Sequence, residues 1–144
     1  QRQFSKLEPA AFPNRAEIDE YFALPSPLEI SLALAQSKSA WATRTLASLT
    51  KGSPLMVHVV LAQIRKARNM GLADDLRMER DLVHHCFHLR ERSETVEGIR
   101  ALAVDKDHQP KWAHGQLSDV ADTEWPAFFE SPWSAETHPL RHLS

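Results

Sequence analysis

The chain has 144 residues, 42% hydrophobic and 25% charged, so it is long enough for one domain with a core and too apolar for disorder throughout. Its 17 basic and 19 acidic side chains give a formal charge of −2, which excludes a global positive field for binding nucleic acid. Cys86 is the single cysteine, which excludes an internal disulfide, and the eight His residues show no spacing of structural zinc ligands.

Targeting features are missing from the sequence. No apolar run approaches the roughly 20 residues needed to cross a bilayer, and the N-terminus lacks the basic-then-apolar order of a secretory signal. We therefore expect a soluble protein with no membrane partner, in the cytosol or an organelle matrix. The chain begins at Gln1 rather than Met, which agrees with a fragment or a processed product.

Helical periodicity dominates the chain. It has only four Gly and almost no strict alternation of apolar and polar residues, whereas apolar residues recur at spacings of three and four. This pattern predicts an all-α fold of about five to six helices. Residues 1–25 form an N-terminal connection, in which Asn14 caps a short helix that runs through Phe22.

Three further helices are predicted to begin at serine caps, and in two of them a proline follows the serine directly. At Ser26 the cap, the following Pro and Glu29 at the third helical position predict a helix to about residue 36. Ser37 or Ser39 begins the next helix, which Gly52 closes. Ser53 then opens the most apolar helix, which ends before residue 71 and whose inward stripe is predicted to contain Val57, Val60, Leu61 and Ile64.

A long helix is predicted from residue 72 to about 92. Glu79 lies between Leu76 and Val83 on its apolar face, where an unpaired carboxylate is costly to bury. A general acid or base is one interpretation. We favour a structural ion pair with an arginine of a neighbouring helix, either Arg65 or Arg100.

The same helix carries His84, His85, Cys86 and His88, which invite comparison with a metal site. Cys86 lies round the side of the helix from His84 and His88, and no second ligand pair follows. We expect no metal, and we interpret Cys86 as a small buried apolar group rather than a thiol nucleophile.

Ser93 is predicted to cap a last helix that ends near Lys106, because Pro110 prevents its continuation. Its inward residues are predicted to be Val96, Ile99, Leu102 and Ala103. Residues 113–144 then form an irregular tail rich in Pro, Ser, His and aromatic residues. Four aromatic residues there are too apolar to remain in water, so we expect them against the helices or against a missing domain: Trp125, Phe128, Phe129 and Trp133.

The stretch from Glu97 to Trp112, EGIRALAVDKDHQPKW, joins a helix end to a charged, proline-stopped segment that helix packing does not require. It resembles the C-terminal part of 3-hydroxyisobutyryl-CoA hydrolases, a branch of the crotonase, or enoyl-CoA hydratase/isomerase, superfamily. The resemblance covers about residues 26–112 as one helical domain and includes the runs SP, QIRKARNMGL, LRMERDL and HC. His58 departs from it, because a Lys is expected there.

The resemblance implies that the reactive groups lie elsewhere. Crotonase-type proteins resemble one another in an N-terminal spiral domain that supplies two N–H groups for the thioester oxygen and carboxylates that activate water. Nothing before Ser26 is long enough for that unit, so we assign no catalytic residue here and expect a missing N-terminal domain as a partner. Self-association is a further expectation, since a domain without its neighbour leaves apolar surface uncovered.

By the same resemblance, the C-terminal helices close over the CoA end of the pocket. Lys106 and Lys111, with Arg100, are then candidates for contact with the phosphates of coenzyme A, as is Trp112 for stacking on adenine. The alternatives are solvated charges, or pairs with Asp105 and Asp107, and a core role for the tryptophan. Coenzyme A would be part of the substrate, and no separate cofactor is expected.

Three functions follow as hypotheses. The first is the C-terminal domain of a hydrolase of 3-hydroxyisobutyryl-CoA or a similar short 3-hydroxyacyl-CoA in valine degradation, inactive by itself. The second is the same domain of an enoyl-CoA hydratase/isomerase, and the third is a helical interaction module without catalysis. The resemblance places the parent in the cytoplasm of a bacterium or in the mitochondrial matrix of a eukaryote.

Overall fold

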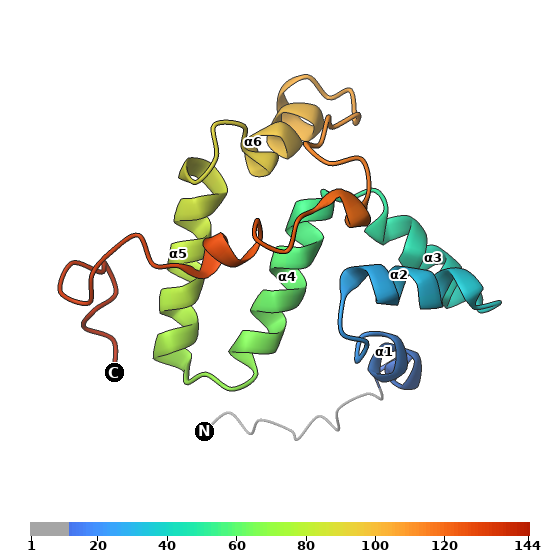
Figure 1. Cartoon of the computed structure of the whole chain (residues 1–144), viewed down its shortest axis with the longest axis horizontal. Coiled ribbons are helices and arrows are strands. Elements are labelled where there is room, and N and C mark those ends of the chain that lie inside the picture. The colour runs from blue at the N-terminus through green and yellow to red at the C-terminus, as the bar shows by residue number, and fades with distance from the viewer. Residues whose placement is uncertain (1–11) are drawn as a thin grey trace, which may run out of the picture.

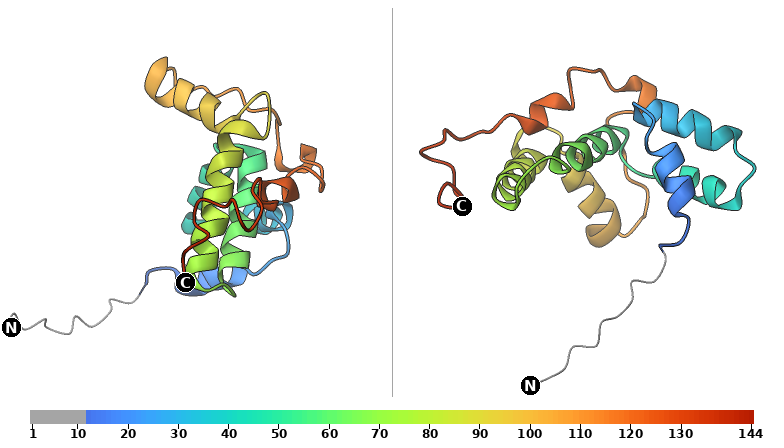
Figure 2. Two further views of the ribbon diagram at one scale, coloured as in Figure 1. Left: turned by 90° about the vertical axis from the view of Figure 1, so that its left-hand side faces the viewer. Right: turned by 90° about the horizontal axis from the view of Figure 1, so that it is seen from below.

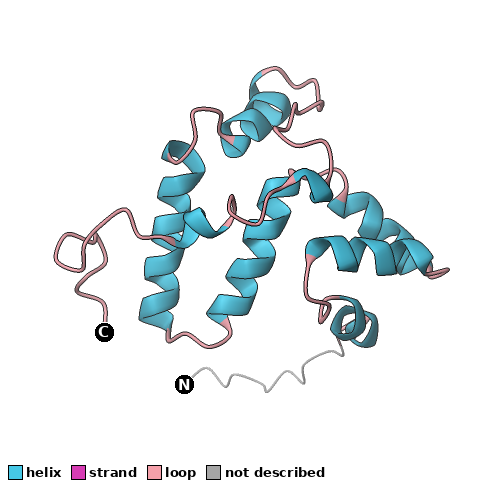
Figure 3. Ribbon diagram, in the orientation of Figure 1, coloured by secondary structure: helices cyan, strands magenta, loops and turns pink. Residues whose placement is uncertain are grey.

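A computed structural model describes residues 12–144 and is all-α in that range (Figures 1 and 3). This confirms the predicted fold class. The remaining residues of the predicted N-terminal connection, 1–11, lie outside the described part. The α-helices are α1 (Arg15–Tyr21), α2 (Pro27–Gln36), α3 (Ala40–Leu49), α4 (Pro54–Ala67), α5 (Leu72–His88) and α6 (Glu94–Ile99), followed by the π-helix η1 (Arg100–Val104) and the 3-10 helices η2 (Leu117–Asp119) and η3 (Pro126–Phe129).

Serine caps begin four of these helices. The side chains of Ser26, Ser53 and Ser93 each accept a hydrogen bond from the backbone N–H three residues later, as predicted. Of the two alternatives at α3, Ser39 is the cap, because its hydroxyl accepts from the N–H of Trp41. Asn14 precedes α1 at φ 60° and its side chain forms no cap bond, so that prediction is wrong in its mechanism.

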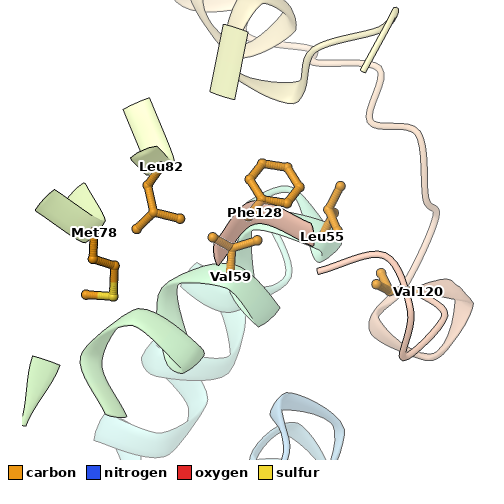
Figure 4. Packing of buried hydrophobic residues seen from close by; sticks show 6 residues of the cluster. All are labelled: Leu55, Val59, Met78, Leu82, Val120 and Phe128. Carbon is orange, nitrogen blue, oxygen red and sulfur yellow. The ribbon is translucent and has the colours of Figure 1, made fainter. Parts of the chain in front are cut away.

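The buried side chains form two cores. One lies between α2 and α3 and consists of Ile30, Leu34 and Ala42. The other joins α4 and α5 to the C-terminal segment, as Figure 4 shows: its buried members are Leu55, Val59, Met78, Leu82, Val120 and Phe128. Because two of these six come from residues 113–144, the tail is part of the core of the helices that it covers.

Polar contacts hold the tail along α5 (Figure 2). Nε2 of His85 lies 2.6 Å from the carbonyl oxygen of Glu130, and Nε2 of His138 lies 3.0 Å from Oδ1 of buried Asp81. One turn earlier, Arg77 donates to the carbonyl oxygen of Leu140 at 3.2 Å.

Of the two places expected for the aromatic residues of the tail, the structure shows the first: Phe128 is buried in the core of the helices, Trp125 and Phe129 pack against it, and the ring centroid of Trp133 lies 4.9 Å from that of His84. Figure 2 (right) shows the tail running along one side of the α4–α5 pair.

The predicted inward stripes are partly wrong. Val60 and Ile64 of α4 are 46% and 57% exposed, and Val96 and Ile99 of α6 are 51% and 46% exposed. Leu102 in η1 is also exposed, as is Ala103. Periodicity identifies residues that share a helix face, but it does not say what covers that face. In residues 12–144 these side chains remain about half exposed or more.

No helix in the described range is both long enough and apolar enough to cross a membrane.

Candidate functional site

The segment with the most specific sequence pattern forms a closed loop on α6. At its end α6 widens into η1, where the N–H of Asp105 donates to the carbonyl oxygen of Arg100 at 2.8 Å. The chain then reverses through Lys106 and His108, both in the left-handed region at φ 57° and 56°. Residues other than Gly adopt this conformation seldom, and π-helical turns occur frequently at functional sites.

Arg100 holds this loop together, because all five of its N–H donors are used. Its Nε and Nη2 donate to the two carboxylate oxygens of Glu97 at 3.0 and 2.8 Å. Its Nη1 donates to Asp107 at 2.8 Å and to Asp105. Nη2 also donates to the carbonyl oxygen of Gln109 at 3.2 Å. One side chain therefore binds α6, the turn and the returning segment.

Arg100 and its three carboxylate partners stabilise one another's charges. Hydrogen bonds from Arg100 and from the backbone N–H of Lys111 lower the pKa of Glu97 to about 2. The pKa of Asp107 is also lowered, by Arg100 first and then by the N–H of Gln109. The three carboxylates raise the pKa of Arg100. Glu97, Asp107 and Arg100 are therefore ionised at neutral pH.

Two glutamates of α6 hold the returning chain. Oε1 of Glu97 accepts from the N–H of Lys111 at 2.6 Å, and Oε1 of buried Glu94 accepts from the N–H of Ala113 at 2.9 Å. Arg92 donates to the carbonyl oxygen of Lys111 at 2.6 Å. The role of Glu94 was not predicted, although its spacing of three from Glu97 places both on one side of the helix.

Trp112 is fixed between these contacts. Its indole N–H donates to the carbonyl oxygen of Lys51 at 3.2 Å, and its ring lies so close to Gly98 that a Cβ added there would be 3.3 Å away. The ring also borders an open pocket of about 570 Å³, which is lined by residues that include Ile99, Leu102, His108 and Pro110. Trp112 is half-buried, so it both packs on α6 and forms a pocket wall.

The two lysines differ from Arg100 in their surroundings. Lys106 and Lys111 are exposed, and within residues 12–144 neither ammonium lies in an ion pair. Their backbones are fixed by the loop, whereas their charges face solvent. Arg100, by contrast, can contact an anion only if one of its five bonds breaks. Its geometry agrees with the alternative that the sequence left open, structural pairs with Asp105 and Asp107.

The expected ion pair of Glu79 is not formed. Glu79 is exposed, and its Oε1 accepts a 3.3 Å hydrogen bond from the amide of Gln63 on α4. Arg65 donates instead to the carbonyl oxygens of Phe22, Leu24 and Pro25, and Arg100 belongs to the loop on α6. The prediction assumed that the face of α5 around Glu79 is buried, and in the described chain it faces solvent.

The histidines of α5 contact the tail. The ring of His84 lies 4.6 Å from that of His88 and 4.9 Å from that of Trp133, between ring centroids. Loss of hydration and the neighbouring His88, His85 and Arg80 lower the pKa of His84. Cys86 packs against the core as an apolar group, although it is half-buried and not fully buried as predicted. Among residues 12–144 no three His, Cys, Asp or Glu side chains are placed to hold a metal ion.

Comparison with known proteins decides the family. The sequence profile described as enoyl-CoA hydratase/isomerase matches residues 1–129. The chain belongs to the enoyl-CoA hydratase/isomerase family. This family membership confirms the resemblance that the 97–112 segment indicated.

Individual relatives and a solved structure agree with that assignment. The chain is 35% identical over 117 residues to 3-hydroxyisobutyryl-CoA hydrolase 1 of Arabidopsis thaliana, covering 78% of this chain and 31% of the relative. It is 34% identical over 105 residues to the mitochondrial 3-hydroxyisobutyryl-CoA hydrolase of Gallus gallus, covering 73% of this chain and 26% of that protein. An enoyl-CoA hydratase from Rhodobacter sphaeroides superposes with a TM-score of 0.75 at 26% identity, over 88% of this chain and 38% of that one. The chain thus spans about a third of the length of these relatives.

Proposed function

We propose that the chain is the helical C-terminal part of a CoA-thioester hydrolase that acts on 3-hydroxyisobutyryl-CoA or a similar short 3-hydroxyacyl-CoA, in valine degradation. The names of the relatives support the substrate, and the match over about a third of their length supports a role as one part of a longer enzyme. The reactive groups would come from an N-terminal crotonase-type domain. Coenzyme A would enter as part of the substrate, without a separate cofactor.

The loop on α6 carries this proposal. Arg100 fixes a turn from which Lys106 and Lys111 extend, beside an open pocket bordered by Trp112. An ammonium group on a flexible stem suits a phosphate, because it forms charge-assisted hydrogen bonds without a fixed direction. We assign the phosphates of coenzyme A to the two lysines and the adenine end to the pocket beside Trp112. Arg100 would position both lysines without touching the ligand.

Titration of the chain with coenzyme A by calorimetry tests this assignment. Replacing both lysines, Lys106→Gln with Lys111→Gln, is expected to weaken binding about tenfold or more, because two charge-assisted contacts are lost. Lys38→Gln is the matched control, since Lys38 is exposed in the connection between α2 and α3 and lies far along the chain from the loop. Equal affinity in the double variant and the control would contradict the assignment.

Arg100→Lys separates positioning from direct contact. Lysine keeps the charge but cannot form five directed bonds, so the loop loses its fixed shape. We expect weaker binding of coenzyme A together with a lower melting temperature. Weaker binding at an unchanged melting temperature would contradict this positioning role and indicate that Arg100 contacts the phosphate without holding the loop.

The isolated chain is expected to hydrolyse 3-hydroxyisobutyryl-CoA at the background rate. A rate clearly above background would show that the reactive groups lie within these 144 residues. In the longer protein, hydrolysis of 3-hydroxyisobutyryl-CoA should exceed hydration of an unsaturated acyl-CoA. The reverse order would favour the alternative, the C-terminal part of an enoyl-CoA hydratase/isomerase, which the likeness to the Rhodobacter sphaeroides hydratase supports.

Location and assembly belong to the same proposal. Relatives described as mitochondrial, from Gallus gallus and Dictyostelium discoideum, support a mitochondrial location for a eukaryotic parent, for which we propose the matrix; for a bacterial parent we propose the cytoplasm. The exposed apolar side chains of α4, α5 and η1 favour association with another polypeptide surface, from a neighbouring domain or from a second copy.

A further inference from the structure

Glu94, the first residue of α6, has two buried carboxylate oxygens with different surroundings. The residue is only 6% exposed. Its Oε1 accepts the N–H of Ala113 at 2.9 Å and thereby holds the returning chain. Its Oε2 is buried as well, but it forms no hydrogen bond with any group in residues 12–144. Because a buried carboxylate oxygen without a donor is costly, Oε2 requires a donor from outside the chain.

A small cavity borders Glu94, and we call it the Glu94 cavity. Its volume is about 10 Å³, which is room for one water molecule and for no larger ligand. Residues from α4, the end of α5, the start of α6 and η3 line it. Its lining combines apolar and polar side chains, including Met56, Phe128, Cys86, His85, Arg90 and Glu94.

Two of the polar lining residues have hydrogen-bonding capacity beyond their contacts with the tail. Nη1 of Arg90 lies 2.9 Å from Oε2 of Glu124, and a guanidinium has further N–H donors. Nε2 of His85 lies 2.6 Å from the carbonyl oxygen of Glu130. A carbonyl oxygen only accepts, so Nε2 donates, and Nδ1 of the neutral ring is then an acceptor. Together with Glu94, these residues offer a donor and two acceptors.

This combination of groups suits water better than a cation. A water molecule in a protein interior forms about three hydrogen bonds, and it can donate two of them and accept the third. A metal cation fits poorly, because it requires several oxygen ligands and would lie beside the positive charge of Arg90.

We propose that the Glu94 cavity binds one water molecule, which donates a hydrogen bond to Oε2 of Glu94 and joins the start of α6 to the end of α5. With this water both oxygens of Glu94 are satisfied while they stay buried. Oε1 can then keep its bond to Ala113, so the water helps to fix the loop on α6. The water site does not depend on the contacts with coenzyme A proposed above.

Relaxation dispersion of the water deuterons tests this site, because it counts the water molecules that stay in the protein longer than its rotation time. Cys86→Ile adds apolar atoms to the cavity lining, whereas Cys86→Ser, the matched control, keeps nearly the size of the side chain. The wild type and Cys86→Ser are expected to hold one more long-lived water than Cys86→Ile. In Cys86→Ile the Ala113 N–H should exchange at least about tenfold faster, because a dry Glu94 carboxylate turns towards solvent.

Circular dichroism verifies that both variants are folded. Equal numbers of long-lived waters in Cys86→Ile and Cys86→Ser overturn the proposal. An unchanged exchange rate of the Ala113 N–H in a folded Cys86→Ile that has lost the water also overturns it, because the water would then not hold α6.

A high-resolution crystal structure of the wild type decides the question even if Cys86→Ile does not fold. It is expected to show a water oxygen within about 3.2 Å of Oε2 of Glu94 and of a second polar group of the cavity. A dry cavity, or Oε2 bound directly to a protein donor, would refute the proposed site.

Discussion

The backbone N–H of Lys111 donates a 2.6 Å hydrogen bond to Oε1 of Glu97, a residue fourteen positions earlier in the chain. The same carboxylate binds the guanidinium of Arg100 through both of its oxygens. Glu97 therefore joins the helix, its arginine and the returning segment at one point. The position of the Lys111 backbone depends on a carboxylate that must stay ionised.

The pH dependence of stability tests this role of Glu97. Its pKa is lowered from 4.5 to about 2 in the folded chain, first by Arg100 and then by the Lys111 N–H. A lowered carboxyl pKa stabilises the fold fully above the unfolded pKa, and that contribution is lost as the pH falls from about 4.5 towards 2. Glu97→Gln should therefore melt at a lower temperature than the wild type at pH 7, and the difference should shrink below pH 4.5.

Thermal melts followed by circular dichroism between pH 7 and pH 2.5 measure this difference. Glu20→Gln is the control, because Glu20 is exposed on α1, and its melting temperature should follow that of the wild type at every pH. A difference between Glu97→Gln and the wild type that stays constant down to pH 2.5 would show that the carboxylate does not titrate as the contacts require.

Gly98 tests the packing of Trp112. A Cβ at position 98 would lie 3.3 Å from the indole ring, and a larger side chain has no room without moving it. We expect Gly98→Leu to displace the ring, break its bond to the Lys51 carbonyl and destabilise the fold, although leucine favours helices more than glycine does. Chemical denaturation followed by tryptophan fluorescence measures the loss.

Gly71→Leu is the matched control for Gly98→Leu. An added Cβ at Gly71 meets no atom within 4 Å, so this variant should be close to the wild type in stability. If Gly98→Leu were as stable as Gly71→Leu, the contact between Trp112 and α6 would not hold the loop.

Local features of the fold were predictable because their causes are local. A serine cap needs a hydroxyl and an N–H group three residues apart, and Ser26, Ser53 and Ser93 satisfy that condition within one turn. Periodicity also placed Leu76, Glu79 and Val83 correctly on one face of α5. Burial of that face was not predictable, because it depends on where residues 113–144 pack.

Pairing of Arg100 with Asp105 and Asp107 was one of the alternatives that the sequence left open, and the choice among them could not be made for a related reason. The two aspartates come within reach of Arg100 only because η1 widens the helix and the chain reverses through left-handed residues. Those reversals occur at Lys106 and His108, where no glycine marks them. The sequence motif identified the right segment. Only the structure shows that its arginine is bound by carboxylates while its lysines are exposed.

Core and stripe residues should respond differently to truncation. Leu55 is fully buried in the core between α4 and the tail, so Leu55→Ala is expected to cost about 3 kcal/mol of unfolding free energy. Ile64 on the same helix is 57% exposed, and Ile64→Ala should cost less than about 1 kcal/mol. Urea denaturation of the two variants measures both values. Equal losses would mean that the open side of α4 is covered in solution.

The contact between His138 and Asp81 should anchor the tail. Nδ1 of His138 accepts the N–H of Leu140 at 3.0 Å, so the proton is on Nε2, which donates to Oδ1 of Asp81. Both side chains are buried. His138→Ala leaves the carboxylate without this partner, which is expected to cost about 2 kcal/mol and to expose residues 130–144 to hydrogen exchange. His142→Ala, at an exposed position of the same segment, should leave exchange unchanged.

A double-mutant cycle separates this contact from general loss of packing. If the bond anchors the tail, His138→Ala and Asp81→Ala together should cost at least about 1 kcal/mol less than the sum of the two single changes, because the second change removes a group that is already unpaired. Additive losses would show that the two side chains act independently. The tail would then be held by its aromatic and aliphatic contacts with α4 and α5, and removing either polar partner would leave exchange over residues 130–144 as slow as in the wild type.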